Sequence, residues 1–164
     1  MLLKIKSTTN RYKDDEVYTD IIKYITNPKK TRSGYIVGFN VEDVATAGLE
    51  MRELASSFNK LKGIRVRHMI LSFDPKKEKD INADFAFYIG CMACRFYEDD
   101  YQMVLAVHEG RDHLHIHIVM NTVNMNTGKK HPGDKQDYYR FQRHLKSVLK
   151  FFGLHLVVHK DAEG

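Results

Sequence analysis

One short stretch constrains the fold of this chain more than any other, the run HLHIHIVMN at residues 113–121. Histidines alternate there with aliphatic residues. Because successive side chains on a β-strand point to opposite faces, the pattern predicts a strand with two unlike faces. His113, His115, His117 and Asn121 share one face, and the aliphatic side chains share the other. Such a strand suits a sheet whose apolar face is covered by helices and whose histidine face is an open cleft.

The remaining chain alternates short strands with amphipathic helices. Strand patterns cover 33–39, 65–73, 101–107, 113–123 and 154–159. Helical patterns cover 15–26, 41–63, 81–97 and 135–153, and Gly63 is the expected C-cap of the second helix. Short strands that include a tight hairpin predict an α+β fold, with a central, mainly antiparallel five-stranded sheet and helices packed mainly on one face.

Length and composition fit one folded domain. The chain has 164 residues, of which 43% are hydrophobic and 29% charged. No apolar run approaches the ~20 residues that a membrane span needs, and the N-terminus becomes polar too early for a secretory signal. We therefore expect a cytoplasmic protein without a membrane span. Cys91 and Cys94 lack the second ligand pair of a structural zinc site and are expected to be small buried side chains.

The net charge of +5 is concentrated in two basic segments, residues 4–32 and 129–150. Two such segments could flank a polyanion such as a nucleic acid. Solvated helix and loop surfaces are the alternative interpretation.

The strand before the histidine run ends at His108, and the register of the hairpin decides whether the rings can meet. If His108 lay opposite His113, it would be four residues, or ~13 Å, from the level of His117, too far for a shared site. If His108 lies opposite His115, all three rings can converge. We predict the second register, which places His113 in the loop.

Neutral imidazoles of His108, His115 and His117 would bind a divalent cation and leave coordination positions open, as catalytic sites do. The alternatives are a run of surface histidines or histidines that are satisfied by hydrogen bonds. Three imidazoles alone do not select among zinc, nickel and manganese.

The run HEGRDHLHIHIVMN at 108–121 closely resembles the third motif of the MobA/VirD2-type relaxases, the MOBP mobilization nucleases of the HUH endonuclease superfamily. Every histidine position of that motif matches. Gly110 departs from it, because the family commonly has Asp there, and Asp112 is the nearby carboxylate that could take its role. RHMILSF at 67–73 resembles the second motif, and DIIKYITNPKKT at 20–31 resembles the first.

The resemblance implies that Tyr24 attacks a phosphodiester of single-stranded DNA at a transfer origin, which leaves a 5′-phosphotyrosine and a free 3′-OH. It also implies Mg²⁺ or Mn²⁺ as the metal, although Zn²⁺ or Ni²⁺ could occupy a three-histidine site. Tyr24 holds the motif position before ITNPKKT. Tyr12, Tyr18 and Tyr35 also lie in the basic N-terminal stretch and remain alternatives.

Further site residues are expected around this centre. Residues that could contact substrate or support the histidines are His113, Asp112, Asn121 and Ser72. Residues that could contact DNA phosphates are Lys29, Lys30, Arg32, Lys129 and Lys130. His68 shares a strand face with Ser72 and is expected to be structural.

The resemblance implies a DNA relaxase for conjugative transfer or mobilization of a plasmid or integrative element in bacteria. The implied partners are supercoiled or single-stranded origin DNA, accessory DNA-binding proteins and conjugation-coupling proteins. Residues 1–164 would be a single catalytic domain, and whether a longer protein contains it stays open. The alternatives are a rolling-circle replication initiator that uses Tyr138 or Tyr139, a non-enzymatic DNA-binding module, and a small-molecule metallohydrolase.

Overall fold

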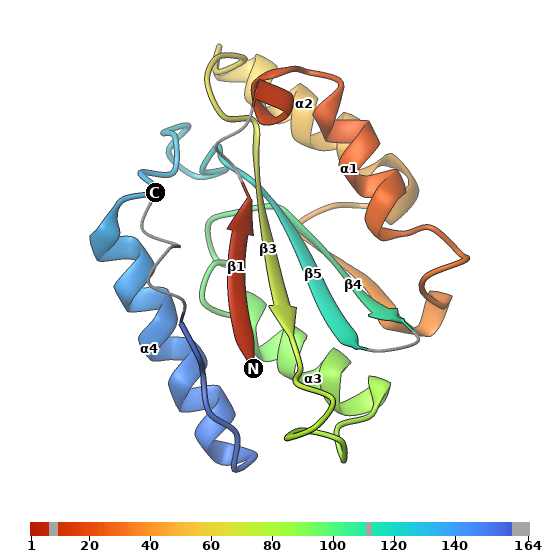
Figure 1. Ribbon diagram of the computed structural model, residues 1–164. Helices are drawn as coiled ribbons and strands as arrows, with labels where there is room; N and C mark the ends of the chain where they lie inside the picture. Colours follow the sequence, from red (N-terminus) through yellow and green to blue (C-terminus); the bar gives the residue numbers. More distant parts are fainter. Residues whose placement is uncertain (7–9, 111–112, 159–164) are drawn as a thin grey trace.

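The computed structural model describes residues 1–6, 10–110 and 113–158. At its centre is an antiparallel five-stranded sheet in the order β1-β3-β5-β4-β2 (Figure 1). The strands are β1 (Leu2–Lys6), β2 (Ile36–Phe39), β3 (Val66–Ser72), β4 (Met103–Glu109) and β5 (Leu114–Asn121). The helices are α1 (Val17–Ile25), α2 (Ala47–Ser57), α3 (Ala83–Cys94) and α4 (Lys135–Phe151). The predicted α+β fold with a central antiparallel sheet of five strands is confirmed.

Side-chain alternation along the strands divides the interior into two cores. Toward α3 and α4, the sheet contributes to a larger core whose buried members include Met69, Leu105, Ile116, Ile118 and Phe141. Toward α1 and α2, it contributes to a smaller core whose buried members include Ile21, Met51, Val104, Ala106 and Val119. The sheet is therefore buried on both faces for part of its area.

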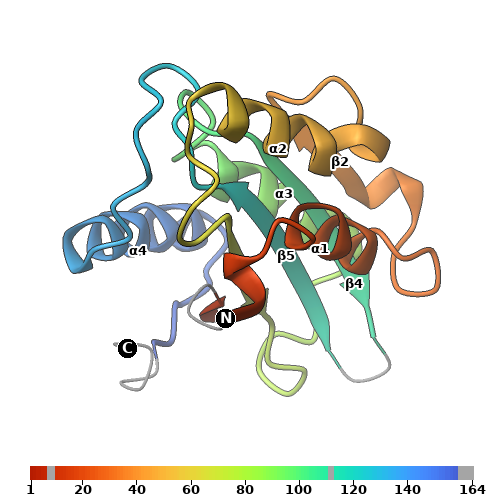
Figure 2. The ribbon, with the colours of Figure 1, turned by 90° about the horizontal axis from the view of Figure 1, so that it is seen from above.

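The helices do not lie mainly on one face, so that part of the fold prediction is wrong. Helices α1 and α2 lie next to one another (Figure 2) and pack over Val66, Val104 and Val119, on the face that also carries the histidines. These valines are apolar side chains on the histidine face. Their burial beneath helices is more favourable than their exposure to water in an open cleft. Only the half of this face near the β4–β5 hairpin stays open.

One edge of the sheet also differs from the prediction. The N-terminal residues form β1, which pairs with β3 so that Lys4 lies opposite Ile70. The run at 154–159 was expected to be a strand, but in its described part Val157 makes a single bridge, to Leu2. Because β1 already pairs with β3 on its other side, the C-terminal segment lies at the edge of the sheet.

Helix α2 is shorter than the pattern at 41–63 indicated. The Asp43 side chain accepts a hydrogen bond from Ala45 N and begins a 3₁₀ turn, Val44–Thr46, before the helix. At the other end, Asn59 has a φ of 55°, in the left-handed region that ends helices. Gly63 was expected to be the C-cap, but it lies in the loop that follows.

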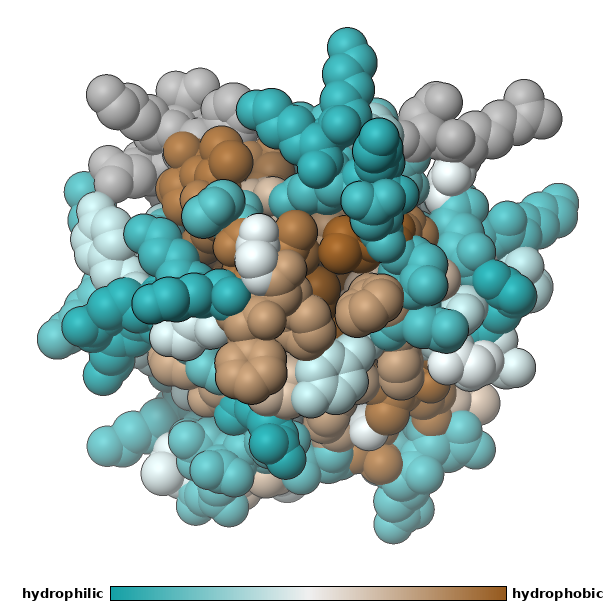
Figure 3. Space-filling view, turned by 90° about the horizontal axis from the view of Figure 1, so that it is seen from below, coloured by the Kyte–Doolittle hydropathy of each residue, from teal (hydrophilic) through white to brown (hydrophobic). Residues whose placement is uncertain are grey.

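Exposed aromatic side chains gather where α3 meets the end of α4. Figure 3 shows apolar side chains grouped on this end of the molecule, surrounded by hydrophilic ones. Phe85, Tyr88 and Phe151 are exposed, and the rings of Phe85 and Tyr88 lie 6.2 and 5.7 Å from that of Phe152. In the described part of the chain, no helix has the length and apolarity to cross a membrane.

Candidate active site

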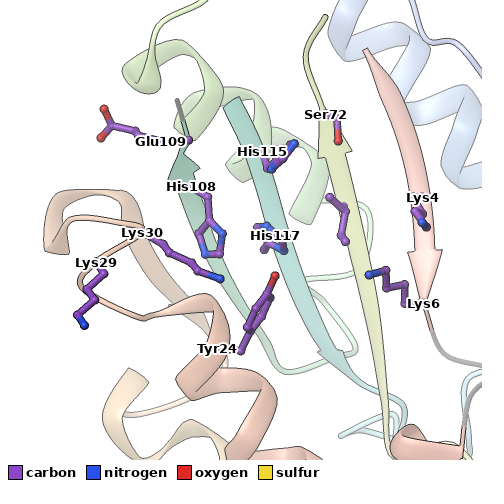
Figure 4. A pocket seen from close by; sticks show the side chains of 12 residues that line it. Lys4, Lys6, Tyr24, Lys29, Lys30, Ser72, His108, Glu109, His115 and His117 are labelled. Atoms are coloured by element: carbon purple, nitrogen blue, oxygen red, sulfur yellow. The ribbon is translucent and has the colours of Figure 1, made fainter. Parts of the chain in front are cut away.

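The β4–β5 hairpin brings the predicted histidines to one pocket. His108 lies directly opposite His115, so the predicted register is confirmed. His108, His115 and His117 line a pocket of about 580 Å³ on the open half of the sheet (Figure 4). The ring centroids of His108 and His117 are 4.0 Å apart, and those of His115 and His117 are 6.1 Å apart.

These three histidines are held in the neutral form. Burial lowers the pKa of His117 to about 2, with smaller contributions from the neighbouring histidines and Lys30. Burial is also the main cause of the lowered pKa values of His108 and His115. At neutral pH each ring therefore keeps one nitrogen lone pair, which is what a metal ligand requires.

Hydrogen bonds engage one nitrogen of the His108 ring and one nitrogen of the His117 ring. His108 Nε2 lies 2.8 Å from the backbone oxygen of Ile25, and because a carbonyl only accepts, this nitrogen carries the hydrogen. The lone pair of His108 is thus on Nδ1. His117 Nδ1 lies 2.9 Å from His68 Nε2, whereas His117 Nε2 is buried and has no partner.

The donor set suits a divalent cation, although the rings are not arranged as a finished site. Within residues 1–6, 10–110 and 113–158, no three His, Cys, Asp or Glu side chains are grouped closely enough to hold an ion. The unpartnered His117 Nε2 is nevertheless a buried polar atom at the pocket, and buried polar atoms normally have partners. Neutral nitrogens in a pocket with an orphaned acceptor position fit a metal such as Mn²⁺ or Zn²⁺.

Helix α1 places Tyr24 over the histidines. The Tyr24 ring lies 5.9 Å from the rings of both His108 and His117, and Figure 4 shows its hydroxyl directed into the pocket. The side chain is 41% exposed, so a large substrate can reach it. The Lys30 ammonium lies 4.3 Å from the centre of the ring.

The other candidate tyrosines lie elsewhere. Tyr18 points into the α1–α2 core, and burial raises its pKa to about 12. Tyr12 is buried against His68, and Tyr35 donates to Asp84 outside the pocket. Tyr138 belongs to α4 and packs against the core on the opposite face of the sheet. Tyr139 is also on α4.

The predicted basic residues separate into two groups. Lys29 and Lys30 line the pocket, and Arg32 lies beside it, where its guanidinium binds both carboxylate oxygens of Glu109. Lys130 instead donates to Ile64 O and Thr122 Oγ1 at the far end of β5, about 17 Å along the strand from His117. Lys129 precedes it there, so the structure does not bring these two lysines to the pocket.

The remaining predicted residues are also divided. Ser72 lines the pocket. His113 is in the hairpin loop, with its ring 5.8 Å from that of His115, and it does not line the pocket. Asn121 is fully buried at the far end of β5, where it bonds Met51 O and Gln102 Oε1. Asp112 lies outside the described residues.

The sequence did not predict that several residues lie in or directly behind the pocket. Lys4 and Lys6 of β1 line the pocket because β1 borders β3. His68 contacts His117, and Tyr12 contacts His68. The face that His68 shares with Ser72 was a signal for its position, whereas Tyr12 and the two β1 lysines had no local signal beyond the basic composition of the N-terminal segment.

Comparison with known families gives a match over most of the chain. Residues 24–154 match the family described as Relaxase: MobA/VirD2-like, nuclease domain. The chain belongs to this family. The match begins at Tyr24 and includes the whole β4–β5 hairpin.

Individual relatives agree with this assignment. The group II intron-interrupted relaxase LtrB of Lactococcus lactis subsp. cremoris is 28% identical, over 76% of this chain and 26% of that protein. Protein rlx of Staphylococcus aureus is 30% identical, over 57% of this chain and 28% of that protein. This relaxase-family chain therefore spans about a quarter of the length of these curated relatives.

Solved structures share the fold. The MobM relaxase domain (MOBV; Mob_Pre) bound to 26-nucleotide pMV158 oriT DNA has a TM-score of 0.64 at 12% identity, over 94% of this chain and 88% of that one. A Mn-bound crystal structure of the same domain with pMV158 oriT DNA has a TM-score of 0.61 at 11% identity, over 100% of this chain and 93% of that one. At these identities the likeness establishes the fold.

Proposed function

We propose that the chain is the catalytic domain of a DNA relaxase, which nicks one strand of DNA at a transfer origin through Tyr24. The observation that carries this proposal is the position of Tyr24, the pocket-lining tyrosine, 5.9 Å from two neutral histidines in a chain of the relaxase family. The proposed role is conjugative transfer or mobilization of a plasmid or integrative element. Accessory DNA-binding and coupling proteins would be its partners there.

The pocket residues would bind and orient a single strand. Lys29 and Lys30 on one side, and Lys4 and Lys6 on the other, offer ammonium groups to consecutive phosphates. Ser72 can donate its hydroxyl to a phosphate oxygen between them. The open half of the sheet would thus accommodate a strand whose scissile phosphate lies between the Tyr24 hydroxyl and the histidines.

The proposed reaction is a transesterification. The Tyr24 oxygen forms a bond to phosphorus and loses its proton to solvent, while the bond from phosphorus to the 3′ oxygen breaks and that oxygen takes up a proton. One phosphodiester replaces another, so a later attack by a 3′-OH can rejoin the strand. A divalent cation held by His108, His115 and His117 would supply positive charge to the non-bridging phosphate oxygens. The Mn-bound relaxase structure with the same fold supports Mn²⁺ or Mg²⁺ in this role.

The test is denaturing electrophoresis after the protein is mixed with labelled single-stranded oligonucleotides that tile the transfer origin, in the presence of Mn²⁺. We expect a covalent protein–oligonucleotide band that EDTA abolishes and that Tyr24→Phe eliminates. Tyr138→Phe is the matched control and keeps the band, because Tyr138 packs on the other face of the sheet.

Two outcomes would overturn the proposal. If Tyr138→Phe loses the band and Tyr24→Phe keeps it, the nucleophile is on α4, as in a rolling-circle initiator. If the protein binds the oligonucleotides but never nicks supercoiled origin plasmid with Mg²⁺ or Mn²⁺, it is a DNA-binding module.

A further inference from the structure

Behind the pocket, three buried side chains form a line of hydrogen bonds that ends at the orphaned nitrogen. Tyr12 Oη lies 3.2 Å from His68 Nδ1, and His68 Nε2 lies 2.9 Å from His117 Nδ1. All three residues are at most 4% exposed. The line leads from the 3₁₀ turn Asn10–Lys13, through the middle of β3, to the pocket strand β5.

The backbone positions Tyr12 at one end of this line and His68 in its middle. Tyr12 O accepts from Arg65 N at 2.8 Å, which ties the 3₁₀ turn to the start of β3. His68 pairs with Val119, so its ring lies beside that of its diagonal neighbour His117, with centroids 5.1 Å apart. The ring of His117 is thus held between His68 and the pocket.

Counting hydrogens shows what the line can control. Each neutral imidazole has one N–H, and one hydrogen lies between His117 Nδ1 and His68 Nε2. If His117 carries it, His117 Nε2 presents a lone pair to the pocket and His68 Nδ1 donates to the Tyr12 oxygen. If His68 carries it, His117 Nε2 presents an N–H, which no cation can bind.

Metal-binding histidines usually owe their tautomer to a carboxylate or carbonyl that accepts from the second nitrogen. Of the described residues that line the pocket, Glu109 alone is acidic, and Arg32 engages its carboxylate. At His117 the neighbour in that place is His68. A neutral acceptor there adds no negative charge beside the site, which keeps the pocket favourable to phosphates.

We propose that His68 is a positioning residue, which accepts the Nδ1 hydrogen of His117 and so presents the His117 Nε2 lone pair to a divalent cation. Tyr12 completes the arrangement by accepting from His68 Nδ1. The inference rests on the proposed function only for the identity of the site, because it concerns binding of the metal alone.

The test measures the tautomer of His117 and the affinity for Mn²⁺, both without DNA. Long-range ¹H–¹⁵N spectra of the metal-free protein, labelled at histidine, should show His117 as the Nδ1–H tautomer. His68→Leu removes the acceptor, so we expect the Nε2–H form to appear and Mn²⁺ affinity to fall by about 10- to 100-fold. His68→Gln can accept through its amide oxygen and should recover most of that affinity.

A matched control separates this effect from general damage. His144 also makes a hydrogen bond to a neighbour, Met92 O, but it lies on α4 on the other face of the sheet. His144→Leu should bind Mn²⁺ as the unaltered protein does. If His68→Leu fails to fold, Tyr12→Phe and His68→Gln still report on the tautomer.

The inference is overturned if His117 is the Nε2–H tautomer in the unaltered protein, or if His68→Leu binds Mn²⁺ with undiminished affinity. Neither result depends on nicking. A protein that binds Mn²⁺ as described but forms no covalent DNA adduct would refute the proposed function and leave this inference standing.

Discussion

His117 and Asn121 lie four residues apart on the same face of β5, yet their surroundings differ completely. His117 borders the open pocket and keeps one nitrogen without a partner, whereas Asn121 lies beneath α2 and uses both ends of its amide. The α1–α2 pair covers one half of this face and leaves the other half open. Position relative to these helices, more than position on the strand, decides which side chain can meet a substrate.

For Asn121 we therefore predict a structural role. Asn121→Ala would leave Val123 N and Met51 O without their buried partner, at a cost of about 1 to 3 kcal/mol in the free energy of unfolding. Urea unfolding measures this cost, and the affinity for Mn²⁺ should not change. The exposed Asn126→Ala is the control. A loss of Mn²⁺ affinity without loss of stability would place Asn121 back in the site.

At the scale of elements, the loop after α1 is fastened to the β4–β5 hairpin. Glu109 N donates to Lys30 O at 3.1 Å, and the Arg32 guanidinium binds both oxygens of the Glu109 carboxylate. This pairing cancels the charge of Arg32 beside a pocket that is otherwise basic. It is exposed to solvent, so its contribution to stability is small.

We predict that Glu109→Gln strengthens DNA binding. Removal of the carboxylate releases the Arg32 charge for a phosphate, so the affinity for single-stranded DNA should rise and the dependence of log K on log salt should steepen by about one. Fluorescence anisotropy at several KCl concentrations measures both. Glu53→Gln makes the same charge change on α2, and equal effects of the two substitutions would contradict a local role for Arg32.

Helix α4 is anchored by a buried cluster on the face opposite the pocket. Asp137 accepts from Arg67 at 2.9 Å and Tyr97 at 2.8 Å, and it lies 3.0 Å from His131 Nε2. Burial alone would raise the pKa of Asp137. Hydrogen bonds from His131, Tyr97 and Arg67 outweigh that effect and hold the pKa well below its usual range.

The lowered pKa makes this anchor sensitive to acid. The folded value lies below the unfolded value of about 4, so the ionised carboxylate stabilises the fold above pH 4, and this contribution is lost as pH falls toward the folded value. Asp137→Asn should destabilise the protein by about 3 kcal/mol at neutral pH. In urea unfolding the difference between the two proteins should shrink below about pH 4. A constant difference would contradict the ionised state, and the exposed Asp80→Asn serves as control.

Elements with a strong local pattern were predictable, and those that depend on distant partners were not. The β4–β5 register followed from strand spacing and the reach of an imidazole. The strand β1 has only five residues, LLKIK, and becomes a strand by pairing with β3, more than sixty residues on in the register Lys4 to Ile70. The run at 154–159 has a strand-like sequence, but among the described residues its pairing is limited to the single bridge between Val157 and Leu2.

Over the whole molecule, the two cores leave one open half-face rimmed by lysines. Lys4 and Lys6 alternate with Leu3, which is buried in the larger core, so both ammonium groups are on the pocket side. Lys29 and Lys30 lie on the opposite side of the pocket, so lysines border the proposed DNA-binding path on both sides.

We predict that Lys4→Ala with Lys6→Ala weakens DNA binding and lowers the salt slope by about two, because each lysine that contacts a phosphate contributes about one. Anisotropy with single-stranded DNA measures the slope, and Mn²⁺ affinity should be unaffected. Lys146→Ala with Lys150→Ala removes the same charge from α4. If that pair has the same effect, binding depends on total charge and not on β1.

The candidate site was predictable only as far as the motifs extend. Side-chain alternation along β5 predicted that the histidines share one face, and the resemblance to the first motif indicated Tyr24 as the nucleophile. The contacts of His68 join residues 49 and 56 positions apart, and no local pattern encodes them. Lys129 and Lys130 looked equivalent to Lys29 and Lys30 in composition, but the length of β5 separates the two pairs.

Because β5 is the central strand, the histidines that it carries should be more rigidly held than Tyr24 on α1. The strand is bonded on both edges and takes part in both cores, so its amides should be among the slowest in the protein to exchange with deuterium. Tyr24 instead belongs to a nine-residue helix that packs on the sheet through the smaller core alone, and its own side chain is exposed. We therefore expect the imidazoles to be the stationary side of the pocket, and adjustment to the proposed substrate strand to come from the helix that bears the phenol.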